Sequence, residues 1–256
     1  MKLDGQRKLD GKTAVVVGGG RDIGRAVSIA LAAEGAKVAV NYCHDRQAAA
    51  GTLAEIERAG GSAVLCQADA TSLADMDRLA EETCDAFGGS IDILANVVGG
   101  LVARRTLPEM DEAFFDTVMR LNVHSVFFAT KAVLPKLNDG GSIINFSSQA
   151  GRDGGGPGAS AYATGKGALM SFTRSMAKEL GGRNIRVNAV CPGMIATSFH
   201  DRFTKDEVRQ KVAAGTPLGR QGRAGEVADV VAFLASDDAA FITGACIDVN
   251  GGLLFS

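Results

Sequence analysis

Tyr162 and Lys166 lie four positions apart in a run that is typical of a helix, and Ser148 precedes them at the end of an apolar segment. Side chains at positions i and i+4 of a helix are neighbours, so the ammonium group of Lys166 can sit beside the phenol. A nearby cation favours the phenolate and lowers the pKa of a tyrosine, which is about 10 without a partner. The pair predicts a tyrosine that acts as a general acid, with Ser148 holding a substrate oxygen. A tyrosine and a lysine that share a helix surface by chance would show the same spacing, so other motifs must decide.

A glycine-rich run, Gly18 to Ala26, follows the first apolar segment and opens the first expected helix. Glycines let the backbone turn sharply and approach a diphosphate, which the N–H groups at the start of a helix can bind. Glycine is common in any turn between a strand and a helix, so the position after the first strand is what gives the motif weight. The run predicts a dinucleotide-binding loop.

Short apolar segments alternate with longer helical ones along the chain, which is the pattern of a parallel sheet with helices on both faces. Strands are expected at 13–17, 37–41, 63–67, 91–95, 142–146, 186–190 and 245–249. Helices are expected at 23–33, 46–59, 72–87, 111–137, 160–180, 205–214 and 224–235, with Thr71, Ser72 and Asp111 as N-cap candidates. We therefore expect one doubly wound α/β domain over residues 1–256, with small substrate loops near 151–159 and 194–223.

The composition excludes several classes of protein. A chain of 256 residues with a formal charge of −2 offers no electrostatic basis for binding nucleic acid or an anionic membrane. No apolar stretch approaches the roughly 18 residues that a membrane span needs, and Met1–Lys8 lacks the apolar core of a signal peptide. The five cysteines are odd in number, far apart and without metal-ligand spacing (Cys43, Cys66, Cys84, Cys191 and Cys246). We expect reduced thiols, no metal site and a cytoplasmic protein.

Together, the glycine loop and the Tyr-x-x-x-Lys pair resemble the short-chain dehydrogenase/reductase family, and the likeness extends over nearly the whole chain. The resemblance implies a Rossmann-type sheet of seven parallel strands, a nicotinamide cofactor and a homotetramer. It also implies that Tyr162 protonates the substrate carbonyl, that Ser148 steadies its oxygen, that Lys166 holds the cofactor ribose and that Asn122 positions a relay water. Ser147 is the alternative serine. The residues that the family pattern assigns to the cofactor, beside Tyr162 and Lys166, are Gly18, Gly20, Arg21, Asp22, Ile23, Gly24, Tyr42, Asp69, Ala70, Asn96, Gly99, Pro192, Gly193, Ile195 and Thr197.

Three residues depart from the family pattern: Val17 replaces a threonine, Asp22 a glycine and Val97 an asparagine. Aspartate tolerates the backbone angles of such a turn better than most residues. It can also cap the helix expected to begin at Ile23. Its carboxylate must avoid the cofactor diphosphate, and we expect it to turn toward Arg21 or Arg25.

The end of the second strand bears on the choice between NAD and NADP. Tyr42 stands where a relative that prefers NAD would carry an aspartate, and Arg21, His44 or Arg46 could meet a 2′-phosphate. NADP is therefore the preferred cofactor, with NAD possible because Asp22 and Asp45 could face the same pocket. The residues just after the strand are equally consistent with a solvated loop and a helix cap.

Substrate determinants are expected in the loops beyond the carboxyl ends of the strands. The candidates are Arg104, Gln149, Gly155, Met194 and His200. Arg104 and Arg105 could bind a carboxylate, although an exposed basic loop or a subunit contact would have the same sequence. These loops are similar to those of keto-sugar-acid reductases from uronate and alginate breakdown, which implies a small, polar, carboxylated substrate. A 3-oxoacyl thioester reductase is the main alternative, and a catalytically silent dinucleotide sensor is the alternative from another class.

Overall fold

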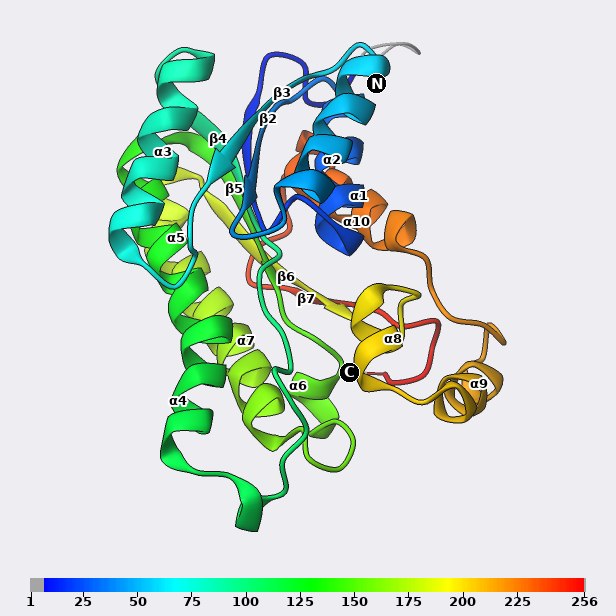
Figure 1. The fold of residues 1–256 in the computed structure, drawn as a ribbon. Coiled ribbons are helices and arrows are strands. Elements are labelled where there is room, and N and C mark those ends of the chain that lie inside the picture. The colour runs from blue at the N-terminus through cyan, green and yellow to red at the C-terminus, as the bar shows by residue number, and fades with distance from the viewer. Residues whose placement is uncertain (1–6, 256) are drawn as a thin grey trace.

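Seven parallel strands form one sheet in the order β3-β2-β1-β4-β5-β6-β7, as expected for a doubly wound α/β domain (Figure 1). The strands are β1 (Thr13–Val17), β2 (Lys37–Tyr42), β3 (Ser62–Gln67), β4 (Ile91–Asn96), β5 (Leu137–Phe146), β6 (Arg186–Pro192) and β7 (Cys246–Val249). The computed structural model describes residues 7–255. Residues Met1–Gln6, which belong to the segment expected to lack the apolar core of a signal peptide, lie outside the described part.

The strands are rich in buried β-branched residues. Their side chains point alternately into two cores, one on each face of the sheet. In β1 every residue is buried. Ala14 and Val16 pack into the core on one face of the sheet, whereas Val15 and Val17 pack into the core on the other face. Successive side chains of a strand point to opposite faces, so a strand covered on both sides must be apolar throughout. This requirement is why the apolar runs of the sequence predicted the strands to within a few residues.

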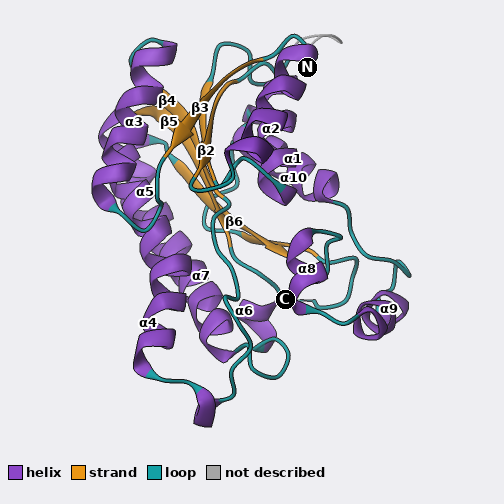
Figure 2. Cartoon of the chain, viewed as in Figure 1, coloured by secondary structure: helices purple, strands orange, loops and turns teal. Residues whose placement is uncertain are grey.

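Helices cover both faces of the sheet (Figure 2). The core of one face includes side chains of α1 (Asp22–Ala33), α2 (Arg46–Arg58) and α10 (Ala224–Ala235). The core of the other face includes side chains of α3 (Leu73–Phe87), α5 (Ser125–Val133) and α7 (Ser160–Leu180). Ser72, Asp45 and Asp111 each accept a backbone N–H at the start of a helix, so the capping predicted for Ser72 and Asp111 is confirmed.

The single helix predicted over 111–137 is wrong, because the segment is interrupted. It contains α4 (Glu112–Met119), a π turn over Arg120–His124, α5 and a 3-10 turn over Leu134–Lys136, and Leu137 already belongs to β5. At the π turn the side-chain amide of Asn122 donates to Val118 O at 2.9 Å. Pro135 lies in the 3-10 turn, where a residue without an N–H ends the regular hydrogen bonding.

Three further helices lie in the loops predicted to bind substrate, beyond the carboxyl edge of the sheet. They are α6 (Ala150–Asp153), α8 (Ser198–Phe203) and α9 (Asp206–Gly215), of which only α9 was predicted. In Figure 1, α8 and α9 stand apart from the main body of the sheet and its helices. Within residues 7–255 no helix combines the length and the apolar character that crossing a membrane would take.

Candidate active site

The glycine loop lies at the carboxyl end of β1 and is held in place by Asn41 of β2. Gly18 N donates to Asn41 Oδ1 at 3.0 Å, and Gly19 N donates to Asn41 O at 2.9 Å. The amide of Asn41 also donates to Ala68 O at 3.0 Å, beyond the end of β3. Asn41 thus joins three strand ends, and the sequence analysis missed it. A buried polar residue inside the apolar run of β2 was the available signal.

The turn between β1 and α1 is tight enough to require glycine at two positions. A Cβ atom on Gly24 would lie 1.9 Å from Gly18 O, and Gly18 itself has a left-handed φ of 76°. The backbone therefore approaches the start of α1 with no side chain in between. The N–H groups at the start of a helix attract an anion, so this turn fits the diphosphate of a dinucleotide.

Asp22 meets the sequence-based expectation only in part, because its carboxylate pairs with Arg21 but not with Arg25 and it does not cap α1. It adopts a left-handed φ of 50°, as expected, but it is the first residue of α1, and Arg21 takes the N-cap position without a side-chain cap. Its carboxylate does not turn toward Arg25, which pairs with Glu55. Instead it accepts hydrogen bonds from Ser198 N at 3.0 Å and from Ser198 Oγ at 2.6 Å, with Arg21 Nε at 3.8 Å.

Ser148, Tyr162 and Lys166 come together beyond the end of β5. The Ser148 hydroxyl lies close enough to the Tyr162 phenol to lower its pKa. Lys166 Nζ donates to Phe146 O at 2.7 Å, and Lys166 is 3% exposed. Ser147 Oγ donates to the backbone oxygen of Lys166 at 2.7 Å, so it faces away from the phenol. Of the two candidate serines, only Ser148 faces Tyr162.

The pKa values in this cluster follow from burial. Burial raises the pKa of Tyr162, and the neighbouring Ser148 hydroxyl offsets part of that rise. Burial also lowers the pKa of Lys166 to about 8. The expected lowering of the tyrosine pKa by the lysine is absent, because Lys166 Nζ points to Phe146 O and lies 5.9 Å from the centroid of the Tyr162 ring. Helical spacing made the residues neighbours without bringing the charge to the phenol.

Asn122 faces the same cluster across Gly99. A Cβ atom on Gly99 would lie 2.6 Å from Lys166 Nζ and 2.7 Å from Asn122 Oδ1, so only glycine lets these two side chains approach the backbone this closely. The amide of Asn122 donates to Gly100 O at 2.8 Å and accepts from Gly100 N at 3.0 Å. These bonds commit Asn122 to holding the loop after β4 beside Lys166.

Asn96, which the family pattern assigns to the cofactor, is fully buried at the end of β4. Its amide donates to Asn145 Oδ1 at 2.9 Å, and Asn145 in turn donates to Thr173 Oγ1 of α7 at 3.0 Å. Asn96 Oδ1 is one of two buried polar side-chain atoms in the described residues that have no partner. The side chain therefore ties β4 to β5 and α7, with one acceptor left free.

The residues expected at the adenosine end lie at the carboxyl ends of β2 and β3. Tyr42 is 8% exposed, and Asp69 Oδ1 accepts from both Thr71 N and Thr71 Oγ1 at 2.8 Å. Asp45 caps α2 by accepting from Ala48 N at 2.9 Å, so its carboxylate is occupied. A pocket of about 410 Å³ lies here and is lined by Cys43, His44, Gln67, Ala68, Asp69, Asp75 and Arg78.

The end of β6 supplies the residues expected at the nicotinamide end. Gly193 N donates to Val249 O at 3.1 Å, and Gln149 N donates to Pro192 O at 3.0 Å. Ile195 is buried and forms an isolated parallel β-bridge with Gly222. The backbone N–H of Gly222 donates to Met194 O. Thr197 then begins α8 as its N-cap residue. The structure thus brings the turn after β6 beside Ser148 and its neighbour Gln149.

Helix α8 lies against Tyr162. The ring centroids of Phe199 and Tyr162 are 6.0 Å apart. Arg104 donates to Phe203 O at 3.2 Å and to Pro157 O at 2.9 Å, so it joins α8 to two other substrate loops. Burial, together with Arg209 and Arg104, lowers the pKa of His200 to about 4, which leaves the imidazole neutral at pH 7.

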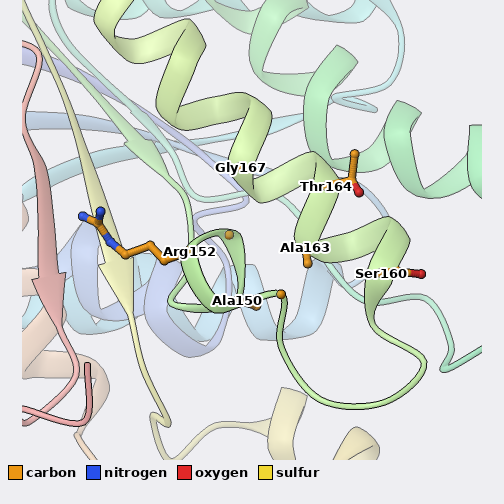
Figure 3. A pocket seen from close by; sticks show the side chains of 8 residues that line it. Ala150, Arg152, Ser160, Ala163, Thr164 and Gly167 are labelled. Atoms are coloured by element: carbon orange, nitrogen blue, oxygen red, sulfur yellow. The ribbon is translucent and has the colours of Figure 1, made fainter. Parts of the chain in front are cut away.

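A pocket of about 390 Å³ between α6 and α7 lies apart from this cluster (Figure 3). The residues of α7 that line it lie on a different side of the helix from Tyr162 and Lys166; they are Ser160, Ala163, Thr164 and Gly167.

Gly155, a predicted substrate residue, lies two positions after Asp153, whose carboxylate accepts a hydrogen bond from Gly155 N at 2.8 Å. Within residues 7–255 no group of three or more histidine, cysteine or acidic residues could hold a metal ion, and the five cysteines are free.

Comparison with known proteins agrees with this geometry. Residues 18–254 match the family model described as enoyl-(acyl carrier protein) reductase. An uncharacterized oxidoreductase of Methylorubrum extorquens is 39% identical over 248 residues, which cover 96% of this chain and 99% of the relative. The 3-oxoacyl-[acyl-carrier-protein] reductase of a Synechocystis species is 40% identical over 250 residues, covering 96% and 98%.

Solved structures lead to the same family. A short-chain dehydrogenase/reductase from Serratia marcescens superposes with a TM-score of 0.91 at 34% identity, covering 96% of this chain and 99% of that one. A blue fluorescent protein from a metagenomic library, in complex with NADPH, gives a TM-score of 0.90 at 34% identity, covering 97% and 100%. The chain therefore belongs to the short-chain dehydrogenase/reductase family and is an oxidoreductase that uses a nicotinamide cofactor.

Proposed function

We propose that the protein is an NADP(H)-dependent carbonyl reductase in which Tyr162 protonates the substrate oxygen. The observation that carries this proposal is the cluster of Ser148, Tyr162 and buried Lys166 next to the glycine loop, in which the Ser148 hydroxyl is close enough to the phenol to lower its pKa. Two neighbouring hydroxyl groups can both turn to a carbonyl oxygen placed between them. Such a pair binds and protonates the oxygen in one step.

The residues present fit a nicotinamide dinucleotide. The tight turn from Gly18 to Gly24 would hold its diphosphate, and Lys166, which Gly99 allows to approach the backbone closely, would hold a ribose. When bound, the cofactor supplies the hydride. Burial keeps Tyr162 in its protonated, donating form in the cofactor-free protein. Lys166, with a pKa of about 8, would return a proton to Tyr162 once a negative charge is present nearby.

NADP is our preferred cofactor. The two carboxylates that could have repelled a 2′-phosphate have other partners, since Asp45 caps α2 and Asp22 bonds to Ser198. Arg21 keeps its side chain 69% exposed beside the loop, and His44 and Arg46 are exposed just beyond β2. The similar blue fluorescent protein is described in complex with NADPH, which supports the same choice.

For the substrate, we propose a small, polar keto or aldehyde sugar acid. The loops around Tyr162 bring Arg104 and Arg209 close enough to His200 to lower its pKa. Positive charge at the entrance favours a carboxylate. Phe199 over the Tyr162 ring leaves little room for a bulky group in this arrangement.

The second candidate is reduction of a 3-oxoacyl thioester. The similarity to the Synechocystis 3-oxoacyl-[acyl-carrier-protein] reductase and the description of the matching family model favour it. An acyl chain would require α8 to move away from Tyr162. Acetoacetyl thioesters separate the two candidates, because a sugar-acid reductase should not reduce them.

We further propose a homotetramer in the cytoplasm. Phe115 of α4 and Phe127 of α5 are 36% and 45% exposed, and Phe241 near the start of β7 is fully exposed, so apolar side chains remain for partner subunits to cover. Gel filtration that gives a monomer would contradict the assembly.

The test is a screen of sugar acids, polyols and keto thioesters with NADPH and with NADH, together with a Tyr162→Phe variant. We expect the variant to lose at least a hundredfold in kcat because it lacks the donor, while its cofactor affinity stays within threefold of wild type. Nicotinamide fluorescence measures the binding. Full activity in the variant would show that another group is the acid.

A further inference from the structure

Helix α8 is held at its two ends by side chains from two distant parts of the chain. At its start, Ser198 is bonded to Asp22 of the dinucleotide loop, 176 positions away in sequence. At its end, Phe203 O accepts from Arg104 of the loop after β4. No residue of α8 is fully buried, and Phe199, His200 and Phe203 are half-buried. These end contacts, together with the contact of Phe199 with Tyr162 and the ion pair of Asp201 with Arg209, therefore hold the helix in place.

The contact at Asp22 is made by both carboxylate oxygens. One oxygen accepts the backbone N–H of Ser198 at 3.0 Å, and the other accepts its hydroxyl at 2.6 Å. The N–H groups at the start of a helix have no partner within the helix, so a carboxylate placed there is favourable. Arg21 Nε, at 3.8 Å, is the nearby cation.

The backbone of Asp22 indicates that the side chain has a role at this position. Its φ of 50° is a conformation that suits glycine, and the family pattern has glycine here. Aspartate accepts the same angles at a modest cost. What the aspartate adds is the carboxylate, and the carboxylate is bonded to α8.

We propose that Asp22 is a positioning residue that fastens the start of α8 to the dinucleotide loop and so holds Phe199 over Tyr162 before substrate arrives. The contact between the tilted rings of Phe199 and Tyr162, with centroids 6.0 Å apart, is the point where this effect reaches the site. The fastening by itself is independent of the reaction. Its consequence for turnover rests on the function proposed above.

The experiment measures how often α8 opens, by limited trypsin digestion of the cofactor-free protein at the exposed residues Arg202 and Lys205. Asp22→Gly removes the carboxylate and relieves the left-handed φ, so strain cannot explain a result. Loss of two hydrogen bonds to a charged acceptor should speed cleavage at these sites about 5- to 30-fold. Mass spectrometry of the fragments assigns the sites.

Three companion variants make the test specific. Ser198→Ala should speed cleavage less than Asp22→Gly, because the backbone N–H bond remains. The double variant should be cleaved at the same rate as Asp22→Gly alone, because both changes act on one contact. Asn184→Gly is the matched control, because Asn184 is exposed, has a φ of 55° and lies outside this contact. Unchanged cleavage in Asp22→Gly, or equal acceleration in Asn184→Gly, would overturn the proposal.

Kinetics then separate positioning from a merely structural effect. We expect Asp22→Gly to raise the KM for the carbonyl substrate about tenfold and to change kcat less than threefold, with Asp22→Asn between it and wild type. Equal losses in kcat at constant KM would overturn the positioning role. If Asp22→Gly is cleaved faster but the wild-type protein reduces no carbonyl compound, the proposed function is wrong and the role of Asp22 in holding α8 is supported.

Discussion

The floor of the active site and the helix that covers it are built in different ways. On the floor, Ser147 and Lys166 are buried and make hydrogen bonds to backbone oxygen atoms inside the protein. Above them, α8 and α9 contain no fully buried residue, and half-buried Asp22 and exposed Arg104 hold the cover in place.

This difference decides what each region can do. A buried polar group that loses its partner costs about 1–3 kcal/mol, so the floor keeps one geometry. The hydrogen bonds of Asp22 and Arg104 lie where water can replace the lost partner, so the cover can open and close at a smaller cost. Changes to the floor should therefore reduce the chemical step, and changes to the cover should mainly weaken substrate binding.

The largest effect should come from the two neighbouring serines of the floor. Ser148→Ala removes the hydroxyl that faces Tyr162, and we expect kcat to fall about 10²- to 10⁴-fold. Ser147→Ala removes a buried hydrogen bond to the backbone oxygen of Lys166, and we expect a loss of stability of about 1 kcal/mol with kcat within fivefold of wild type. Steady-state kinetics and urea unfolding measure both. Equal kcat values for the two variants would contradict the assignment of Ser148.

A second test uses the pKa of Lys166, which folding lowers from 10.5 to about 8. Between pH 8 and pH 10 the unfolded chain keeps this proton while the folded protein loses it. Stability should therefore rise with pH, by up to about 3 kcal/mol for a shift of this size. Lys166→Met should lose that rise in urea unfolding followed at pH 7.5, 9 and 10. Parallel curves for the two proteins would mean that Lys166 is not buried as the structure describes.

The smallest effect should come from the cover. Arg104→Ala removes the contacts with Phe203 O and Pro157 O, and we expect the KM for substrate to rise about three- to tenfold with kcat nearly unchanged. Arg105→Ala is the matched control, because Arg105 pairs with Asp111 and lies over the Phe114 ring instead. A change of the same size in Arg105→Ala would show that the basic loop acts through its charge alone.

Local patterns predicted most of the fold. The apolar runs of β1 and β6 are buried on both faces, and Ser160–Leu180 forms α7 with the predicted bounds. The interruption of the predicted helix at Asn122 could not be read in this way. It depends on bonds between Asn122 and the loop at Gly100, which is distant in sequence.

The candidate site was predicted to a similar extent. Spacing identified Ser148, Tyr162 and Lys166, and the structure brings them together. Spacing could not show that Asn41 holds the glycine loop, or that Asp22 bonds to Ser198. These partners are chosen by the packing of strands and loops, which no local window contains.

By itself, the sequence determined the order of the strands and of most helices, the glycine turn and the residues of the candidate site. Periodic burial and helical spacing are local properties of a chain, so they can be read from it. Only the tertiary structure decided the direction of the Tyr162 pKa shift and the fastening of α8. Burial and long-range hydrogen bonds exist only once distant segments pack together, and here burial outweighs the neighbouring charge.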